Sequence, residues 1–401
     1  MKIRKLTEGE MDLSIRMSEF AFQYELTDEE REERKGWLKP DQTLVVEEDG
    51  QIVSKATVLP LQTYFLGKSI AMGGVSGVVT WPENRRSGLV KTLLLECLKN
   101  MKSNGQVLSY LYPFSIPFYR KMGWELFADQ QTLTLTREQL PSRKQTDGYI
   151  KRIEKNHILV DSIYQIWAKQ FNGTLVRDAD WWTNSTFKRK KGEVAVYYSK
   201  DHEARGYVFY QVKSRKMTVH ELIWLDPESR DGLWTFISNH DSMLEKLEVT
   251  TTPAGTVPFL LEDPKIHREI SSYFMARIVD VESFLSIIPF YDSDNTEPII
   301  LHITDEFCQW NDGTYFIYPT KDRSTNSSIR FFPKKASTNS SCQHAPEKGI
   351  RLSVQSLTVL LMNSQPMYHL YNEGYVKGDW KTAGRFARSY PKQEPFIYDF
   401  F

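Results

Sequence analysis

The sequence has few cysteines, and they are poorly placed to bridge or to bind a metal. Its 401 residues hold three, Cys97, Cys308 and Cys342, which are odd in number, far apart and without CxxC spacing. A disulfide framework and a zinc site are therefore not expected. Cys97 falls on the core face of a predicted helix. We expect a reduced, cytoplasmic protein that holds no metal.

Histidine is absent from the first 156 residues, since the first of the eight is His157. Any acid or base confined to that part of the chain must be another residue type, and Ser-His-Asp hydrolysis within it is excluded. The sequence also lacks the HExxH, GxSxG and Walker A patterns. These absences remove several common hydrolases and nucleotide-binding enzymes from consideration.

No excess of charge and no long apolar run is present. Lys plus Arg equals Asp plus Glu at 51 each, so a nucleic-acid partner, which favours a basic protein, is not expected. No apolar stretch reaches the roughly 18 residues of a membrane span, and the start lacks the apolar segment of a signal peptide. The chain is longer than the roughly 250–300 residues of a single core, so it should form more than one domain.

The first 140 residues predict an α+β unit around a mixed sheet. Thr27 is a predicted N-cap with Glu30 in a capping box, and an Asp49-Gly50 turn predicts a hairpin. The expected strands are 2–6, 43–46, 52–58, 70–80, 107–112 and 124–136, and the expected helices are 8–22, 28–35 and 89–101.

Polar residues 141–148 predict a linker to a second unit, residues 141–285. There we expect a helix at 159–171 and strands at 193–198, 203–211 and 216–225. The segment Pro82–Leu89 finds an echo in Pro227–Leu233, each expected to follow a strand and to precede a helix. The echo predicts a duplicated fold whose second anion-binding loop has decayed; chance similarity in so short a stretch is the alternative.

A third domain is predicted for residues 286–401. Its expected elements are strands at 299–304, 314–319 and 329–332, a polar loop at 334–348, a helix at 354–362 and a long irregular tail. The tail ends in aromatic residues up to Phe401, whereas chain ends are usually polar and frayed. Burial of such an end would desolvate its α-carboxylate and make it a better base; simple docking into a core or a subunit interface is the alternative.

Two segments of the first unit could carry chemistry. The turn Arg85–Val90 opens a helix with two arginines and Gly88, a pattern that favours phosphate binding through free N–H groups and the helix dipole, although RRxG before a helix also occurs by chance. In Pro117–Trp124, Tyr119 could act as a general acid because a phenol stays protonated near neutral pH; a packed aromatic is the alternative. The acidic run Asp28–Lys35 is a solvated helix or a rim that attracts an amine.

Together, strand Val78–Thr80, the turn Arg85–Val90 and the segment Phe118–Trp124 resemble the signature of the GNAT acetyltransferases. The whole chain resembles the Eis (enhanced intracellular survival) family. The resemblance implies two tandem GNAT-like regions, a C-terminal sterol carrier protein-like domain and a homohexamer.

The resemblance also implies roles for individual residues. Tyr119 would protonate the leaving thiolate, and the Phe401 carboxylate would help to deprotonate the amine. Phe22, Tyr24 and Trp37 would line the substrate pocket. The acetyl-CoA-binding residues would be Val78, Val79, Thr80, Arg85, Arg86, Ser87, Gly88, Leu89, Val90, Lys91, Phe114 and Ser115.

This chain departs from the family pattern at two positions. Val90 replaces the usual small residue of the RxxGx[GA] motif, and Phe400 replaces the usual acid before the terminal Phe. The second departure bears on the charge of the substrate, because that acid contacts cationic amines.

The predicted function is acetyl transfer from acetyl-CoA to a primary amine by direct attack in a ternary complex. Aminoglycosides, polyamines and protein lysines all remain possible acceptors. Two alternatives stay open: a protein whose C-terminal domain binds an apolar ligand, and an inactive protein that binds acetyl-CoA for regulation.

Overall fold

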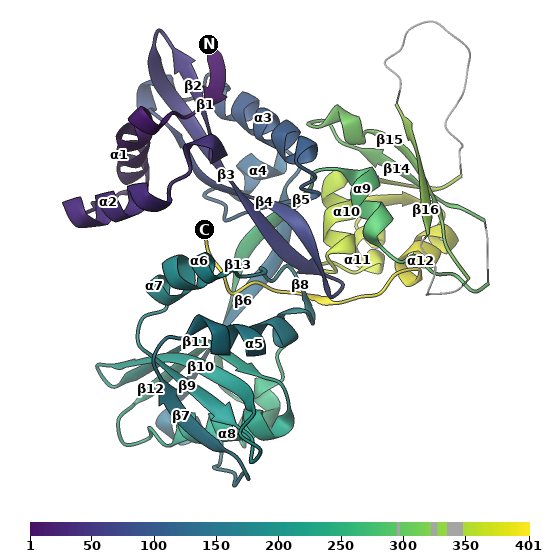
Figure 1. Ribbon diagram of the computed structural model, residues 1–401. Coiled ribbons are helices and arrows are strands. Elements are labelled where there is room, and N and C mark those ends of the chain that lie inside the picture. The colour runs from purple at the N-terminus through teal and green to yellow at the C-terminus, as the bar shows by residue number, and fades with distance from the viewer. Residues whose placement is uncertain (295–296, 322–326, 335–347) are drawn as a thin grey trace, which may run out of the picture.

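The computed structural model describes residues 1–294, 297–321, 327–334 and 348–401. Its strands form a sheet of twelve, a sheet of five and a pair (Figure 1). The strands are β1 Lys2–Lys5, β2 Thr43–Glu48, β3 Gln51–Phe65, β4 Lys68–Thr80, β5 Leu108–Leu111, β6 Glu125–Thr136, β7 Tyr149–Ile153, β8 Phe171–Asn172, β9 Glu193–Tyr198, β10 Ala204–Lys213, β11 Lys216–Trp224, β12 Lys246–Thr251, β13 His267–Ile278, β14 Ile299–Thr304, β15 Gly313–Tyr318, β16 Ser328–Pro333, β17 Ile350–Ser353, β18 Val376–Gly378 and β19 Glu394–Pro395.

Within the described residues, twelve α-helices and several short turns of other helix types connect these strands. The α-helices are α1 Met11–Phe22, α2 Asp28–Trp37, α3 Leu89–Ser103, α4 Ile116–Arg120, α5 His157–Ala168, α6 Ala179–Trp181, α7 Phe187–Arg189, α8 Pro227–Ser238, α9 Val281–Ile287, α10 Val354–Leu361, α11 Met367–Asn372 and α12 Trp380–Arg388. Two short turns that matter below are η5 Trp182–Thr186 and η6 Val257–Leu260.

The twelve-stranded sheet consists of two similar halves that exchange their last strands. Its order is β1-β2-β3-β4-β5-β13-β6-β12-β11-β10-β9-β7. Strand β13, from the second half of the chain, pairs with β5, as in Met275 opposite Leu111. Strand β6 pairs with β12, as in Leu135 opposite Leu247. Each half therefore needs a strand from the other to complete its sheet.

The first half follows the predicted element order, and its local signals are confirmed. Thr27 caps α2 with a capping box, and Asp49 and Gly50 have the left-handed backbone of a tight hairpin turn. Helix α3 buries Leu93, Cys97 and Met101, spaced four residues apart, against the sheet. Cys97 and Cys308 are buried free thiols, and Cys342 lies outside the described residues.

One prediction for the second half is wrong. The segment Pro227–Gly232 does not precede a helix but forms the start of α8, whose N-cap is Asp226. Gly232 lies inside this helix because Tyr197 leaves no room for a side chain: a Cβ there would come 2.3 Å from the tyrosine ring. The two echoed segments thus follow equivalent strands but have different conformations.

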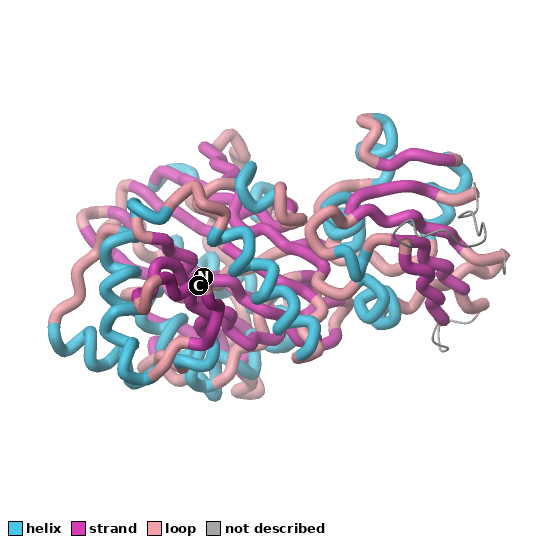
Figure 2. The backbone as a smooth tube through the Cα atoms, turned by 90° about the horizontal axis from the view of Figure 1, so that it is seen from above, coloured by secondary structure: helices cyan, strands magenta, loops and turns pink. Residues whose placement is uncertain are grey.

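The third domain lies at one end of the molecule, with its small sheet set apart from the large one (Figure 2). Its strand order is β16-β15-β14-β17-β18. The buried residues of α10, such as Leu357 and Leu360, join one hydrophobic core with Tyr110 of β5 and Phe274 of β13. The apolar face of α10 is thus occupied by protein. The predicted loop at 334–348 falls almost wholly outside the described residues.

The sequence predicts a long irregular tail after α10, and this prediction is wrong. The tail forms α11, β18, α12 and β19 before its last residues cross back to the large sheet. Helix α12 could not be predicted from the sequence because residues 363–393 have a low apolar content. Its N-cap is Asp379, which accepts a hydrogen bond from the first-turn N–H of Thr382 at 2.8 Å. The final segment reaches the centre of the molecule between α1–α2 and α6–α7 (Figure 1).

Candidate functional site

The site forms where strands β4 and β5 separate. Their parallel pairing ends at Gly74 opposite Tyr110, after which β4 continues to Thr80 beside β3 alone. The β3–β4 register shifts next to Gly77, which has a φ of 57°. A bulge of this kind re-aims backbone groups, and the second edge of β4 is left without a β5 partner. The gap gives a linear amide-containing ligand a strand edge to pair with.

The turn at the end of β4 offers an anion-binding site. Gly88 is the N-cap of α3 with a φ of 82°, and no side chain caps this helix. Arg86 also has a left-handed backbone, with a φ of 66°, and is exposed, while Arg85 Nε donates to the Thr80 carbonyl at 3.2 Å. Open N–H groups, the positive end of the helix and two guanidinium groups all favour phosphate oxygens here.

Tyr119 lies on α4, directly after β5. Its side chain is 2% exposed and packs against Phe114, Phe118 and Trp124 with ring centroids 5.3, 5.2 and 6.1 Å away. Burial raises the pKa of the Tyr119 phenol above its ordinary value of 10. The hydroxyl therefore keeps its proton at neutral pH, as a general acid must.

The C-terminal segment enters the site from the third domain and is held along its length. Gln130 Nε2 donates to the Ile397 carbonyl at 3.1 Å, and the Tyr273 hydroxyl donates to the Asp399 carbonyl at 3.0 Å. Beyond these bonds, the Phe401 ring occupies the space in front of Gly74: a Cβ on that glycine would lie 2.8 Å from the ring. The segment therefore ends beside the point where β4 and β5 separate.

A buried charge cluster anchors this segment to the second half of the molecule. Arg177 and Glu221 are fully buried, and Arg177 Nε donates to Asp399 Oδ1 at 2.9 Å while its Nη2 donates to Glu221 at 2.5 Å. Trp181 Nε1 also donates to Asp399 at 2.8 Å. Burial alone would raise the pKa of Glu221, but the charges of Arg177 and Lys190 lower it to about 2. All these charges are compensated, so the cluster fixes the tail rather than supplying a free acid or base.

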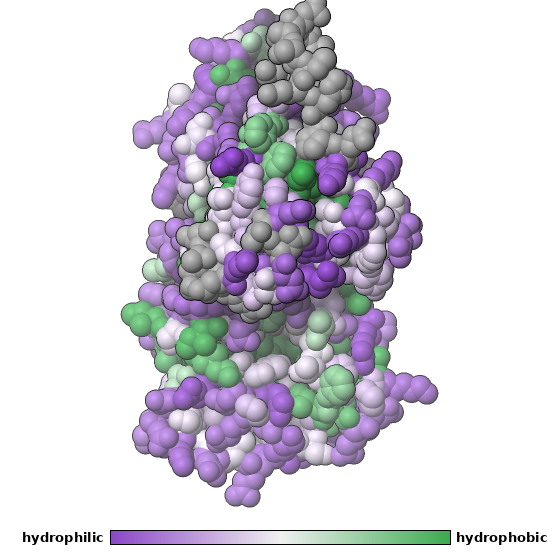
Figure 3. All heavy atoms as spheres, turned by 90° about the vertical axis from the view of Figure 1, so that its right-hand side faces the viewer, coloured by the Kyte–Doolittle hydropathy of each residue, from purple (hydrophilic) through white to green (hydrophobic). Residues whose placement is uncertain are grey.

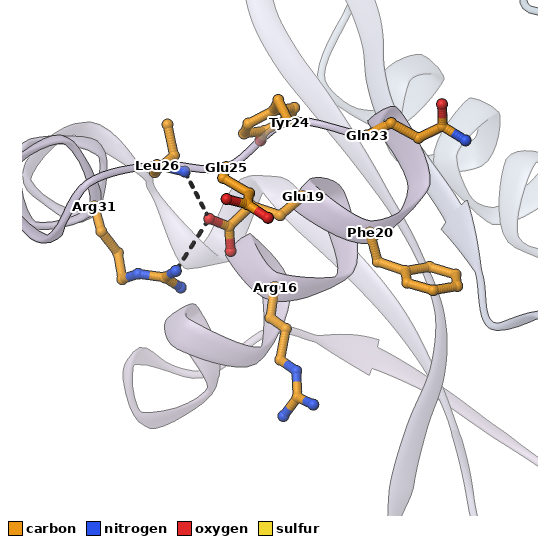
Figure 4. Close-up of a pocket in the computed structure, with 8 residues that line it drawn as sticks. All are labelled: Arg16, Glu19, Phe20, Gln23, Tyr24, Glu25, Leu26 and Arg31. Carbon is orange, nitrogen blue, oxygen red and sulfur yellow. Dashed lines mark hydrogen bonds and ion pairs between the residues drawn. The ribbon is translucent and has the colours of Figure 1, made fainter.

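A cavity of about 730 Å³ lies between α1 and α2 (Figure 4). Tyr24 lines it, whereas Phe22 and Trp37 are not among its lining residues and are 52% and 45% exposed. Glu19 accepts hydrogen bonds from Leu26 N and Arg31 Nη2, both at 3.0 Å, and so ties the loop after α1 to α2 (Figure 4). The predicted substrate residues thus surround this region without converging on one point.

Helices α2 and α7 close the space in front of the C-terminal segment from opposite sides. Lys188 on α7 forms an ion pair with Glu33 on α2 and lies 5.3 Å from the centre of the Trp37 ring. Trp37 therefore contacts the second half of the molecule. The space in front of the C-terminal segment is therefore flanked by both halves, although all the predicted substrate residues come from the first.

The predicted cofactor residues follow one continuous path. Val78, Val79 and Thr80 end β4, the segment Arg85–Gly88 forms the turn, and Leu89, Val90 and Lys91 open α3. Phe114 and Ser115 lie across the gap, where Ser115 is the N-cap of α4 and Phe114 contacts Tyr119. The structure brings these residues together around the gap.

Sequence reasoning missed three residues that shape the site: Gly77, Arg177 and Asp399. An isolated glycine in a strand pattern is a known signal for a bulge and could have identified Gly77. Asp399 is a lone acid in an aromatic run, which suggests a buried partner but not which one. Arg177 has no local signal, because its partners are 44 and 222 residues away along the chain.

Neither a metal site nor a membrane span is apparent in the described part of the chain. It contains no group of three or more His, Cys, Asp or Glu side chains that could hold a metal ion. None of its helices combines the length and the apolar character needed to cross a bilayer.

Three family matches cover most of the chain. Residues 2–127 and 173–278 each match an acetyltransferase (GNAT) domain, and residues 281–398 match a sterol carrier protein domain. The second match includes β13, which completes the sheet of the first unit, and excludes β6.

Similar proteins carry acetyltransferase names. The chain is 24% identical to an uncharacterized N-acetyltransferase of Streptomyces avermitilis, over 76% of this chain and 78% of that one. It is also 24% identical to N-acetyltransferase Eis of Mycobacterium tuberculosis, over 58% of this chain and 62% of that protein.

Solved structures share the whole architecture. A probable N-acyltransferase of unknown function from Enterococcus faecalis superposes with a TM-score of 0.89 at 26% identity, covering 100% of this chain and 99% of that one. Eis1 from Mycobacterium abscessus shares the fold over 100% of both chains, with a TM-score of 0.79 at 19% identity.

Proposed function

Since this chain is an Eis-like GNAT acetyltransferase with a C-terminal sterol carrier protein-like domain, we propose that it transfers the acetyl group of acetyl-CoA to a primary amine. The observation that carries the proposal is the uncapped start of α3 behind Arg85, Arg86 and Gly88. A pyrophosphate matches its open N–H groups and positive charge. Phosphate binding alone fits many proteins, and the buried phenol beside the gap adds the chemistry of transfer.

In this proposal each residue has one task. Arg85, Arg86 and the N–H groups of residues 88–91 bind the pyrophosphate of acetyl-CoA, and Val78–Thr80 pair with its pantetheine arm. The backbone N–H of Val78 donates to the thioester carbonyl oxygen as charge develops there. Tyr119 donates its phenol proton to the thiolate sulfur that leaves.

The acceptor amine must lose a proton before or during its attack. The proposal assigns this step to the α-carboxylate of Phe401, directly or through a water molecule. Its support is the anchored path of residues 396–399, which carries Phe401 to Gly74 at the gap. The amine attacks the thioester directly in this proposal, so no covalent intermediate is needed. Cys97 and Cys308 are also poor candidates for a nucleophile, because both are buried and burial raises the pKa of both thiols.

A thiol-release assay with acetyl-CoA and a panel of primary amines tests the function. We expect CoA release that depends on both the amine and the protein, with the acetylated amine identified by mass spectrometry. Added residues after Phe401 should suppress turnover but leave CoA binding intact. Tight CoA binding without acetylation of any amine would show an inactive cofactor-binding protein instead.

We further propose a cytoplasmic homo-oligomer, a hexamer by family resemblance. Apolar side chains gather in a band below the third domain on one face of the molecule (Figure 3), and large exposed apolar residues include Ile158, Phe259 and Ile270. Large apolar patches often mark subunit interfaces. Sedimentation equilibrium at micromolar protein concentration should give six times the chain mass of 46.8 kDa, and a monomer would exclude the assembly.

A further inference from the structure

A second cavity, of about 250 Å³, lies on the acceptor side of the C-terminal segment. Five of its lining residues come from the second half of the molecule and three from the C-terminal segment. Three segments contribute its walls: the end of η5 with α7, strand β13 and the chain end. The lining residues are Ser185, Thr186, Arg189, Lys190, Tyr273, Tyr398, Asp399 and Phe400.

Arg189 supplies an uncompensated positive charge to this cavity. The other cations nearby, Arg177 and Lys190, are paired with Glu221, and Arg177 also binds Asp399. Within the described part of the chain, no carboxylate lies within ion-pair distance of Arg189, whose guanidinium carbon instead sits 4.9 Å from the centre of the Phe400 ring. Its side chain is exposed, so a ligand that enters the cavity can reach it.

Thr186 presents a hydrogen-bonding group with no partner. Its side chain is 2% exposed, and its Oγ1 atom makes no hydrogen bond within the described residues. Buried hydroxyl groups are normally satisfied, so an unpaired one that lines a cavity indicates a missing ligand or water. A hydroxyl that can donate and a guanidinium that can donate in a fork are together suited to a carboxylate or a phosphate.

We propose that the acceptor carries a negatively charged group that binds between Arg189 and Thr186, so that the substrate is an amine with a carboxylate or phosphate on the same molecule. The inference rests on the proposed acetyltransferase function and narrows its substrate class. It disfavours polycationic amines, because Arg189 would repel their additional charges.

The position of the cavity supports this assignment. Phe400 lines it, and the ring of Phe400 lies 4.9 Å from that of Tyr112, which follows β5 two residues before Phe114. The cavity is therefore continuous with the chain end next to the gap. Burial lowers the pKa of Arg189, and the charge of Arg34 on α2 adds to this effect, so two cations lie near the cavity and favour an anion there.

Matched pairs of amines test the proposal: tyrosine against tyramine, and glucosamine 6-phosphate against glucosamine. We expect the anionic member of at least one pair to have a kcat/KM about tenfold or more above its partner. Arg189→Gln should reduce that ratio toward one, and Thr186→Val should reduce it by a smaller factor. Arg205→Gln, an exposed arginine of the same half paired with Glu203, should keep the wild-type ratio.

A higher kcat/KM for the members without the anionic group in the wild-type protein would overturn the inference, as would a ratio that Arg189→Gln leaves unchanged. Calorimetric titration of glucosamine 6-phosphate into the CoA-saturated protein gives an independent readout. Binding that weakens about tenfold in Arg189→Gln supports the anion site even if no amine is acetylated, in which case only the proposed function fails. Absent binding, or equal binding by both proteins, rejects the site.

Discussion

The two GNAT units begin their central helices in opposite ways. In the first unit, α3 starts at Gly88 with no side-chain cap and no acid in its first turn. In the second, Asp226 caps α8 by accepting from Ser229 N at 2.8 Å, and Glu228 in the first turn accepts from the Tyr197 hydroxyl and the Asp147 N–H. One helix start is open and positively charged; the other is satisfied by its own side chains and by the linker.

The two units also differ at the position of the proposed general acid, Tyr119. The first unit has Pro117-Phe118-Tyr119 in the short helix after β5, and the second has Pro258-Phe259-Leu260 in the turn η6 after β12. The phenol of the first unit is therefore replaced by an aliphatic side chain. The second unit supplies structural support through β13 and Arg177. Under the proposed function it also binds the acceptor at the cavity near Arg189, while the cofactor is bound by the first unit.

Among the substitutions considered, loss of the Tyr119 phenol should have the largest effect on activity. Tyr119→Phe keeps the buried ring but loses the proton donor, so we expect kcat to fall by about 10²–10⁴-fold with little change in the KM for acetyl-CoA. Steady-state kinetics with a good amine acceptor measures both constants. Phe259→Ala, at a 90% exposed position of the second unit, should retain the wild-type kcat. An unchanged kcat in Tyr119→Phe would remove this residue from the mechanism.

The two units also differ in their buried cations. Arg177 of the second unit is paired with carboxylates, whereas the buried Lys55 of the first unit contacts neutral groups. Lys55 is 4% exposed, and its Nζ donates hydrogen bonds to neutral oxygens of Ser14 and Ser18. Burial, with a smaller contribution from the charge of Arg34, lowers the pKa of Lys55 from 10.5 to about 7. Between these two values the unfolded chain binds a proton that the folded chain does not, so stability should rise with pH across that window.

The variant Lys55→Met tests this difference in buried charge. As pH rises from about 7 to 10.5, the unfolding free energy of the wild-type protein should increase by roughly 4 kcal/mol more than that of Lys55→Met. The reason is that each pKa unit corresponds to about 1.4 kcal/mol. Thermal unfolding midpoints of both proteins, recorded across this range, give the measurement. Parallel pH profiles would mean that Lys55 is not held neutral.

The open helix start should be sensitive to loss of charge, and the capped one should not. Arg86→Gln should raise the KM for acetyl-CoA about 10- to 100-fold, the usual value of a charged hydrogen bond. Arg230→Gln removes an arginine from the start of α8, where Arg230 is paired with Asp231, and should leave this KM unchanged. Equal effects of the two substitutions would contradict the assignment of the cofactor to the first unit.

The smallest effect should come from uncapping the second helix. Asp226→Ala removes the acceptor of the Ser229 N–H and should cost about 1 kcal/mol of stability. Its kcat and KM should match those of the wild-type protein, because the proposed function assigns no cofactor contact to α8. Thermal unfolding and steady-state assays on the same preparation compare the two quantities. An increased KM for acetyl-CoA would show that the two helix starts are coupled.

Local signals in the sequence predicted most elements and the turn Arg85–Val90, whereas the other candidate cofactor residues were identified by resemblance. The pattern of Leu93, Cys97 and Met101 and the Thr27 capping box depend on neighbours in the chain, so they could be read directly. The residue patterns could not reveal the strand exchange, because β6 and β13 are compatible with either sheet and only three-dimensional pairing selects between them.

The acceptor side was predicted less completely for the same reason. Phe22, Tyr24 and Trp37 were identified by resemblance in the first unit, but Thr186 and Arg189 come from the second, and nothing in their local sequence distinguishes them from surface residues. The prediction that Pro227–Gly232 precedes a helix was wrong because a turn-like composition is also compatible with the first turn of a helix. Pro227 is the first residue of α8.

The exchange of β6 and β13 has a consequence for synthesis on the ribosome. The edge of β5 is completed only when β13 emerges, and the paired residues Leu111 and Met275 are 164 positions apart. At about 5–20 residues per second, that edge waits roughly 10–30 seconds without a partner. During this time neighbouring nascent chains on one message could supply the missing strand to each other. Entangled dimers are therefore the expected misfolded product, and shielding of the nascent β5 edge should raise the yield of native protein.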